Sequence, residues 1–455
     1  MNQPAAHANA SRNIAWAARV VAVMVVLLKV WYMSRSAFGH GPLGPRVIAG
    51  PDSEGYLALA DKPIFSWDFL AGPMVYPLLI KAVFSNWRAI VVAQTLISIV
   101  AWLWLAKALR DALLSPFAKA VAVVGVMATS VAATFQVADV SIGTESISIS
   151  IFCFVVASGI RALSSPTPLR LAAFVAGLIV AGFTRDTNAL FAAIIGIGFL
   201  FGIFRKKSQW VQLVTCSLCC VLGAGLALTL SNHGRRWFWP VTETIAIRIV
   251  GHPTAQPYFE ARGMPVTPVI LELHRDWSTT TRTLSLNDPQ YKRFLEWIET
   301  NGKSTYSQFL ISHPKYVLRE PLRNLNGLTM PNQGGLGRLY GFGIEPSGFT
   351  RVVGSVGFAE VPWIVYTQML FVLGVLAHAT TRIRQRGRPL EKVVIALAIF
   401  WIPHALAIYH GDALGVERHS MTLAAHARII FWITAAIVAD RIVNNNEEPR
   451  GQEHK

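Results

Sequence analysis

Residues 187–204 read TNALFAAIIGIGFLFGIF, and residues 209–230 read QWVQLVTCSLCCVLGAGLALTL. Neither stretch contains a charged residue, and each is long enough to cross a hydrocarbon layer of roughly 30 Å as a helix. The short connection between them holds Arg205, Lys206 and Lys207. Two apolar segments joined by a basic loop predict a helical hairpin in a membrane, with the loop in the cytoplasm.

Apolar stretches of this kind recur along the whole chain. Besides the two above, they occupy approximately residues 14–32, 88–106, 119–136, 145–163, 170–184, 357–378, 392–409 and 421–439. The first is also compatible with a cleaved signal peptide that ends near residues 34–36, but its length and the spans that follow favour a retained helix. The pattern predicts an all-α integral membrane protein with about ten transmembrane helices.

Composition and charge support this class. Only 15% of the 455 residues are charged and 53% are hydrophobic, whereas soluble domains carry roughly 25% charged residues. The net charge of +16 does not indicate a nucleic-acid partner, because the basic residues gather in alternate short loops. Such a bias marks cytoplasmic loops and contact with anionic membrane lipid.

The distribution of these basic residues predicts the orientation. On one side lie Lys107, Arg110, Lys119, Arg161, Arg170, Arg205, Lys206, Lys207, Arg382, Arg384, Arg386, Arg388 and Lys392. The short loops of the other side hold Arg185 and Arg418. Both termini are therefore expected in the cytoplasm of a multi-pass protein of the bacterial inner membrane, with the functional face toward the periplasm or exterior.

The spans divide the chain into four parts. Residues 1–231 form an N-terminal transmembrane module with a first outer loop at about 33–87, and residues 232–356 form a large extracytoplasmic loop. Residues 357–440 hold the C-terminal transmembrane helices, and residues 441–455 form a polar cytoplasmic tail. A loop as long as the second part is usually functional or a folded subdomain.

The four cysteines, Cys153, Cys216, Cys219 and Cys220, all lie in apolar runs. A zinc or redox site is one interpretation of the closely spaced group, but no second ligand pair accompanies it. Small buried packing residues are the simpler interpretation.

The first outer loop contains the sequence Asp52-Ser53-Glu54-Gly55-Tyr56. A carboxylate held near a membrane surface can act as a general base toward an acceptor hydroxyl. Alternatively, Asp52 or Ser53 caps a helix that runs from Glu54 to Asp61. Farther along the same loop, Lys81 is expected near the headgroups, where it would contact lipid phosphate or a lipid-linked substrate.

Charged residues also stand at the predicted outer ends of the spans. Glu145, in the first turn of a span, has the right charge for a helix N-terminus. Arg185 and Asp186 lie in a tight hairpin, where they either neutralise each other or form part of a site, because ionisable residues at membrane depth are costly. The segment His410 to His419 holds five titratable groups and is either a solvated turn or a further part of the site.

The order of these features resembles that of the GT-C glycosyltransferases, polytopic enzymes that use sugars linked to polyprenyl or dolichyl phosphate. The segment from Asp52 to Tyr56 matches the first-loop acid of that family, and Tyr76-Pro77-Leu78-Leu79 resembles the surface helix after it. The stretches Thr144-Glu145-Ser146 and Arg185-Asp186 resemble its polar cavity-facing positions. The resemblance covers roughly the first 230 residues, and the rest matches only in general layout.

This resemblance implies transfer of a sugar from a polyprenyl-phosphate donor to a glycan, lipid or protein on the extracytoplasmic side. Asp52, or Glu54 in its place, would deprotonate the acceptor, and the product would be inverted at the anomeric carbon. No cofactor is expected, although some GT-C enzymes use a divalent metal. The residues that would hold the donor phosphate are Arg185, Arg418, Arg235 and Lys81, and those that would contact substrate are Tyr56, Glu145, Asp186 and His419.

Two other classes of protein remain compatible with the sequence. An O-antigen ligase or polymerase would use a polyprenyl-diphosphate glycan, and Arg235, Arg236 and His252 would then matter more than Asp52. A transporter or flippase would carry paired broken helices near the membrane midplane. The concentration of polar residues at the outer ends of the spans favours chemistry at the membrane surface.

Overall fold

The computed structural model describes residues 3–38, 48–49, 51–203, 210–276, 287–330, 362–382, 389–413 and 416–447. Its N-terminal half contains α1 (Gln3–Phe38), β1 (Ile48–Ala49), α2 (Pro51–Asp61), α3 (Trp67–Ala71), α4 (Val75–Ala82), α5 (Trp87–Ala112), α6 (Pro116–Ser130), α7 (Ala133–Val140), β2 (Ser141–Ile142), α8 (Thr144–Ser164), α9 (Pro168–Thr184), α10 (Asp186–Ile203) and α11 (Trp210–His233). The remainder contains α12 (Phe238–Thr244), η2 (Ile245–Ile249), α13 (Gln256–Glu260), α14 (Pro268–Arg275), α16 (Pro289–Trp297), η3 (Ile298–Gly302), α17 (Lys303–Ser312), α18 (Pro314–Arg323), α19 (Leu325–Thr329), α22 (Pro362–Arg382), α23 (Pro389–Gly411) and α24 (Val416–Glu447). The prediction of an all-α membrane protein is confirmed.

Six helices in the described part of the chain are long and apolar enough to cross a membrane, or seven if the bent pair α6 and α7 is one span. The shorter apolar helices Pro168–Thr184, Asp186–Leu200 and Ile364–Val375 occupy three further predicted positions. Every apolar stretch identified in the sequence therefore overlaps a helix. The total of about ten crossings remains a prediction, and α24 continues past residue 441 to Glu447.

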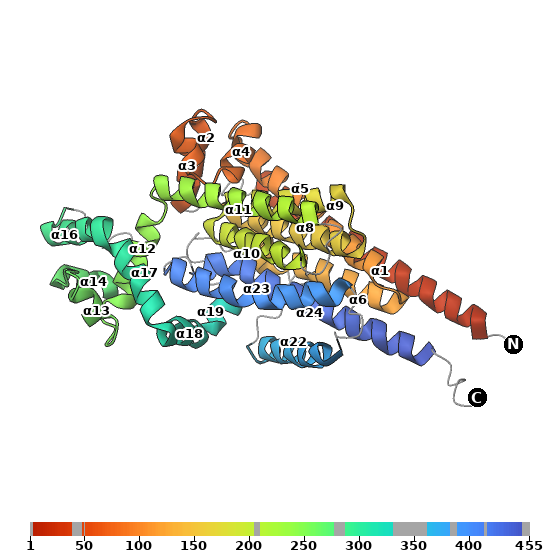
Figure 1. Ribbon diagram of the computed structural model, residues 1–455. Coiled ribbons are helices and arrows are strands. Elements are labelled where there is room, and N and C mark those ends of the chain that lie inside the picture. The colour runs from red at the N-terminus through yellow and green to blue at the C-terminus, as the bar shows by residue number, and fades with distance from the viewer. Residues whose placement is uncertain are drawn as a thin grey trace.

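The long helices form one bundle with distinct ends (Figure 1). Both termini lie at one end of it, and helices α12 to α18 lie at the other. In the predicted topology the end with the termini faces the cytoplasm. The bundle core is built mainly from α5, α6, α7, α8, α23 and α24. In it the fully buried Trp102 of α5 packs tilted against Phe135 of α7 with ring centroids 6.0 Å apart.

The predicted span at 119–136 is not one straight helix, because the chain bends by 54° between α6 and α7. A break in a membrane helix leaves backbone carbonyls that must find other donors. The Ser130 carbonyl accepts from Lys29 Nζ at 2.9 Å, and the Val131 carbonyl accepts from Gln136 Nε2 at 2.8 Å. The bend is therefore stabilised by side chains that a hydropathy pattern does not reveal.

Helices α12 to α18, hereafter the loop domain, have a hydrophobic core of their own. Phe259, Tyr291, Phe294 and Phe309 are each fully buried in it. The predicted large loop is thus a folded helical unit over its described residues. The guanidinium of Arg248 joins it to the bundle, lying 3.8 Å from the Tyr409 ring centroid and donating to the Asp412 carbonyl at 3.1 Å.

A short parallel pairing connects the first outer segment to the bundle. Ile48 pairs with Ser141 and Ala49 with Ile142, and the buried Ser53 donates from Oγ to the Ile142 carbonyl at 2.6 Å. The start of α2 is consequently held beside the start of α8. This arrangement brings Asp52 close to residues that lie far from it in the sequence.

Candidate active site

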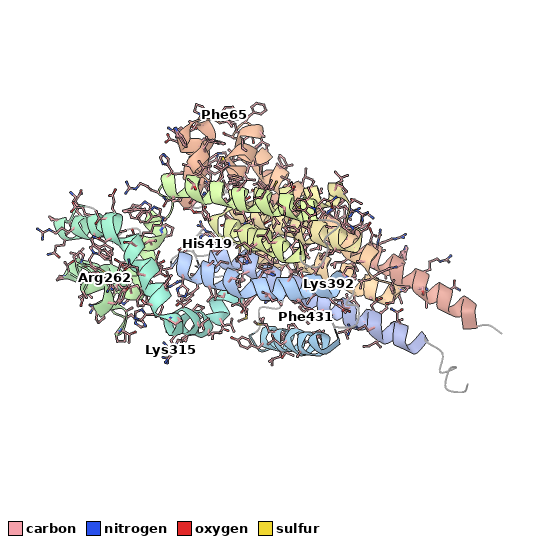
Figure 2. The ribbon with its side chains drawn as sticks, viewed as in Figure 1. Phe65, Arg262, Lys315, Lys392, His419 and Phe431 are labelled. Carbon is pink, nitrogen blue, oxygen red and sulfur yellow. The ribbon has the colours of Figure 1, made fainter. Side chains whose placement is uncertain are left out.

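A cavity of about 480 Å³ lies where the bundle meets the loop domain. Its walls come from α2, from the α9–α10 junction, from the ends of α23 and α24, and from α12 and α17. His419 stands at that end of the bundle in Figure 2. The polar side chains of the lining include Tyr56, Arg185, Asp186, Arg236, Lys303, Asp412 and His419.

Two arginines share one carboxylate at the edge of this cavity. Arg185 Nη2 lies 2.5 Å from Glu145 Oε1, and Arg418 Nε lies 3.2 Å from the same oxygen. Glu145 and Arg185 are 4% and 8% exposed. Burial of these charges is tolerated because each has a partner of opposite sign within hydrogen-bonding distance.

Arg418 also reaches the predicted general base. Its Nη1 atom lies 2.5 Å from Asp52 Oδ2. The Arg418 side chain is 17% exposed and that of Asp52 is 47% exposed, so the bridge stands at the border of the buried cluster. Arg418 thus links a carboxylate of α2 to the carboxylate of α8.

Local backbone structure explains how Glu145 and Arg185 meet. Glu145 lies in the first turn of α8, where the helix dipole favours a negative charge. Arg185 ends α9 in an extended conformation, and its Nε donates to Thr144 Oγ1 at 3.0 Å. Two helix ends therefore face each other, and each supplies one charge of the pair.

Asp52 and Glu54 differ in their surroundings although they are two residues apart. Helix α2 begins at Pro51, which puts both carboxylates in its first turn. Asp52 contacts Arg418, whereas Glu54 is exposed. Of the two acids proposed from the sequence, Asp52 is the one that the fold connects to the arginine cluster.

Arg185 and Asp186 do not neutralise each other. Asp186 accepts from Ser231 Oγ at 2.6 Å and lies 3.1 Å from Arg236 Nη1, whereas Arg185 pairs with Glu145. The two neighbours in sequence thus belong to separate pairs. Both line the cavity.

Asp412 and His419 form a further pair in the cavity wall. His419 Nε2 lies 2.8 Å from Asp412 Oδ2, and the two residues come from the ends of α23 and α24. Asp412 stands in the segment that the sequence singled out but was not itself predicted as a site residue. Arg418, which precedes His419 in the sequence, also lies near its ring, with Arg418 Nη2 3.5 Å from His419 Nε2.

Two tyrosines supply neutral polar groups to the lining. Burial raises the pKa of Tyr56, and it also raises the pKa of Tyr306. Both phenols therefore remain protonated at neutral pH and can donate hydrogen bonds. Tyr306 donates to the His410 carbonyl at 2.9 Å, whereas Tyr56 is packed edge-on against Tyr76 with ring centroids 5.3 Å apart.

Several predicted residues are not part of the cavity lining. Glu145, Arg418 and Asp52 connect to it through the contact of Glu145 with Arg185, and Glu54, Lys81, Arg235 and His252 are also outside it. The Lys81 ammonium donates to the carbonyls of Ala60 and Lys62 at 2.5 and 3.1 Å, which ties α4 to the end of α2. Arg235 pairs with Glu299 at 2.7 Å on the loop domain. The His252 ring accepts from the backbone amides of its own turn at Thr254 and Ala255.

Sequence reasoning missed Lys303 and Tyr306, which enter the cavity from the start of α17. They stand in a short stretch of mixed polar and apolar residues, and no motif marks them. Arg236 was considered only for the ligase alternative. Among the described residues, no group of three or more histidine, cysteine, aspartate or glutamate side chains is placed to hold a metal ion.

No protein-family model matches this chain, and no curated protein matches its sequence. Among solved structures, it is similar to the archaeal oligosaccharyltransferase AglB from Archaeoglobus fulgidus, in complex with an inhibitory peptide and a dolichol-phosphate. The TM-score is 0.43 with 11% identity, and the match covers 96% of this chain and 52% of that one. The chain thus spans about half the length of that enzyme.

Proposed function

We propose that this protein is a membrane glycosyltransferase that takes a sugar from a polyprenyl-phosphate carrier. The observation that carries the proposal is the arrangement of Arg185, Arg418 and Asp52 beside a cavity at the end of the bundle. Arginines suit a phosphate because the planar guanidinium donates two parallel hydrogen bonds to it. A carboxylate beside them suits deprotonation of an acceptor hydroxyl.

The donor phosphate would bind to Arg185 and Arg418. These two guanidiniums now share Glu145, and Arg418 is also engaged by Asp52. A bound phosphate would neutralise the positive charge of Arg418, a role that Asp52 has in its absence. After the sugar leaves, the carrier phosphate departs as an anion held by the same guanidiniums, so that no general acid is required.

The exchange of partners would also activate the base. A carboxylate paired with arginine is a poor proton acceptor, because the guanidinium stabilises its charged form. When phosphate occupies Arg418, Asp52 becomes free to accept the proton of the attacking hydroxyl. The new bond forms from the acceptor oxygen to the anomeric carbon as the bond to the phosphate oxygen breaks, which inverts that carbon.

The ligase alternative receives one supporting observation. Arg236 and Lys303 also line the cavity, so that a diphosphate would find further cations there. The transporter alternative predicts paired broken helices, and the described spans contain the single bent pair α6 and α7. Glycosyl transfer from a monophosphate carrier explains why a carboxylate, Asp52, and a phosphate-binding arginine, Arg418, lie in contact.

A donor assay tests the proposal. Purified protein in lipid nanodiscs is supplied with membrane extracts containing polyprenyl-monophosphate sugars or polyprenyl-diphosphate glycans, and release of the free carrier is followed by mass spectrometry. We expect release from the monophosphate donors and its loss in Arg185→Ala. Turnover confined to diphosphate donors, with Arg236→Ala as the damaging variant, would instead establish the ligase function.

The proposed location of the site requires its own measurement. Ser304 is exposed on α17 and Ser165 is exposed between α8 and α9. In a background without native cysteines, Ser304→Cys should react with an impermeant maleimide on intact spheroplasts, and Ser165→Cys only after permeabilisation. The opposite pattern would place the cavity in the cytoplasm and exclude an extracytoplasmic reaction.

A further inference from the structure

The position of α18 relative to the membrane follows from its contacts with α23. Helix α23 is a candidate span that covers Pro389–Gly411. His410 Nε2 donates to the Val317 carbonyl at 3.0 Å, and Asn324 Nδ2 donates to the Tyr409 hydroxyl at 3.0 Å. Helix α18 is thereby attached to the last turn of a span, which is the depth at which a helix leaves the hydrocarbon.

The chain that follows α18 enters the bundle. Ser420 Oγ donates to the Gly327 carbonyl at 2.9 Å, and Arg428 Nη1 donates to the Thr329 carbonyl at 3.0 Å. Both donors belong to the candidate span Arg418–Asn444. Arg428 lies ten residues after Arg418, a rise of roughly 15 Å along a helix. Helix α19 therefore runs beside the span, from its outer end toward the interior of the membrane. Helix α18, which precedes α19, then lies at the outer boundary of the membrane.

The exposed residues of α18 form two parallel stripes. Tyr316, Val317 and Pro321 face the protein and are buried or half-buried. Leu318 and Leu322 are 53% and 66% exposed, and their spacing of four residues puts them on one stripe. The exposed basic residues Lys315, Arg319 and Arg323 follow the adjacent stripe.

This pattern is that of a helix lying in a membrane interface, where leucines enter the acyl boundary and basic residues reach the phosphates. Lys315 projects away from the rest of the molecule in Figure 2. Arg323 is paired with Glu320 at 2.8 Å, which leaves Lys315 and Arg319 as the cations best placed for an external anion.

We propose that α18 rests on the membrane leaflet at the loop-domain end of the bundle and binds anionic phospholipid there. Leu318 and Leu322 contact the acyl chains, and Lys315 and Arg319 contact the headgroups. The occupant is lipid rather than a protein partner, because the contacts with α23 and α19 hold this surface at the height of the lipid phosphates.

The interface contact would also set the height of the cavity. His410, which binds the Val317 carbonyl, lines the cavity, and so do Tyr306, Ser307 and Leu310 of α17. A membrane-seated α18 therefore fixes the cavity at headgroup depth, where a lipid-linked substrate presents its phosphate. This placement of α18 does not rest on the proposed reaction.

Lipid-borne quenchers test the apolar stripe. The full chain without native cysteines carries a fluorescent label at Leu322→Cys, with Arg262→Cys on the loop domain as control, in vesicles of phosphatidylcholine and phosphatidylglycerol. We expect a nitroxide near the top of the acyl chain to quench the label at 322 several-fold more than the label at 262, and aqueous iodide to do the reverse. Equal quenching by iodide overturns the proposal, and so does protection from both quenchers, which would mean that protein covers the stripe.

Charge reversal tests the basic stripe. At equal mole fraction, spin-labelled phosphatidylglycerol should quench the label at 322 more than spin-labelled phosphatidylcholine does. The excess should disappear in the double variant Lys315→Glu with Arg319→Glu. It should persist when the exposed Lys292 and Arg293 of α16 are reversed as a matched control. No excess in the parent protein, or an excess that survives reversal at 315 and 319, overturns the anionic-lipid assignment.

Discussion

The guanidinium of Arg418 contacts Asp52 at 2.5 Å, although the two residues come from opposite ends of the chain. The same side chain lies 3.2 Å from Glu145, so that one arginine of α24 joins carboxylates of α2 and α8. Arg418 is the residue through which the first outer helix, the core and the C-terminal helices meet. If a phosphate competes for it, Asp52 is the partner with the more exposed side chain and hence the easier one to release.

The exchange of partners predicts a change in the reactivity of Asp52. Addition of decaprenyl phosphate to the protein in nanodiscs should increase carbodiimide labelling of Asp52 several-fold, because Arg418 moves to the phosphate. Labelling of the exposed Glu54, quantified in the same digest, should stay constant. Arg418→Gln should give high labelling of Asp52 with or without the lipid. A lipid-independent, low reactivity of Asp52 in the parent protein would refute the exchange.

Substitution of the two first-loop acids separates their roles. Asp52→Asn should reduce transfer by about 10²- to 10⁴-fold, the range of a general base, because the amide keeps the shape and loses the proton acceptor. Glu54→Gln should have little effect, since Glu54 is exposed and apart from the arginine cluster. Initial rates at saturating donor provide the comparison. Normal activity of both variants would rule out a first-loop base.

Substitutions of Arg185 should show whether this residue binds the donor phosphate or only supports the structure. Arg185→Lys should raise the apparent Km for the donor, because lysine cannot reproduce the planar fork, and Arg185→Ala should nearly abolish turnover. Asp186→Asn should be milder, since Asp186 pairs with Arg236 instead. Activity and melting temperature are measured side by side. A lower melting temperature with normal specific activity of the folded enzyme would reduce Arg185 to a structural partner of Glu145.

Gly143 provides a test that touches neither arginine. It precedes α8 with a φ of −174°, which any residue can adopt. A Cβ atom there would collide with Oε2 of Glu145, so Gly143→Ala should displace that carboxylate and its arginines. A misplacement of about 1 Å can cost about 10²-fold in rate. Gly55→Ala, where the added Cβ meets no atom within 4 Å, is the control and should retain activity.

The buried pair of Lys29 and Asp139 should govern stability rather than turnover. Lys29 Nζ lies 2.5 Å from Asp139 Oδ2, with both side chains almost fully buried. Lys29→Met leaves an uncompensated carboxylate, and breaking such pairs costs about 3–5 kcal/mol. The double variant Lys29→Met with Asp139→Asn should melt closer to the parent protein, as measured by thermal unfolding in detergent. A double variant no more stable than Lys29→Met would mean that the charge balance is not the cause.

The sequence alone determined the membrane class and the positions of the apolar helices. These properties follow from local composition, because a segment of about 20 apolar residues partitions into a bilayer whatever its neighbours are. The sequence also marked Asp52, Glu145, Arg185 and Arg418 as candidate site residues, since charges near the ends of apolar spans are conspicuous. The lysine of α1 and the bend after α6 were not.

Only the tertiary structure decided which charges pair. Adjacency left open whether Arg185 and Asp186 neutralise each other. The extended backbone at the end of α9 directs Arg185 to Glu145 and leaves Asp186 to Arg236. Likewise, no local signal connects Asp52 to Arg418 or brings Lys303 into the cavity. Coulomb attraction falls with distance in space and is indifferent to separation along the chain, so the partners of buried charges emerge only when the helices are packed.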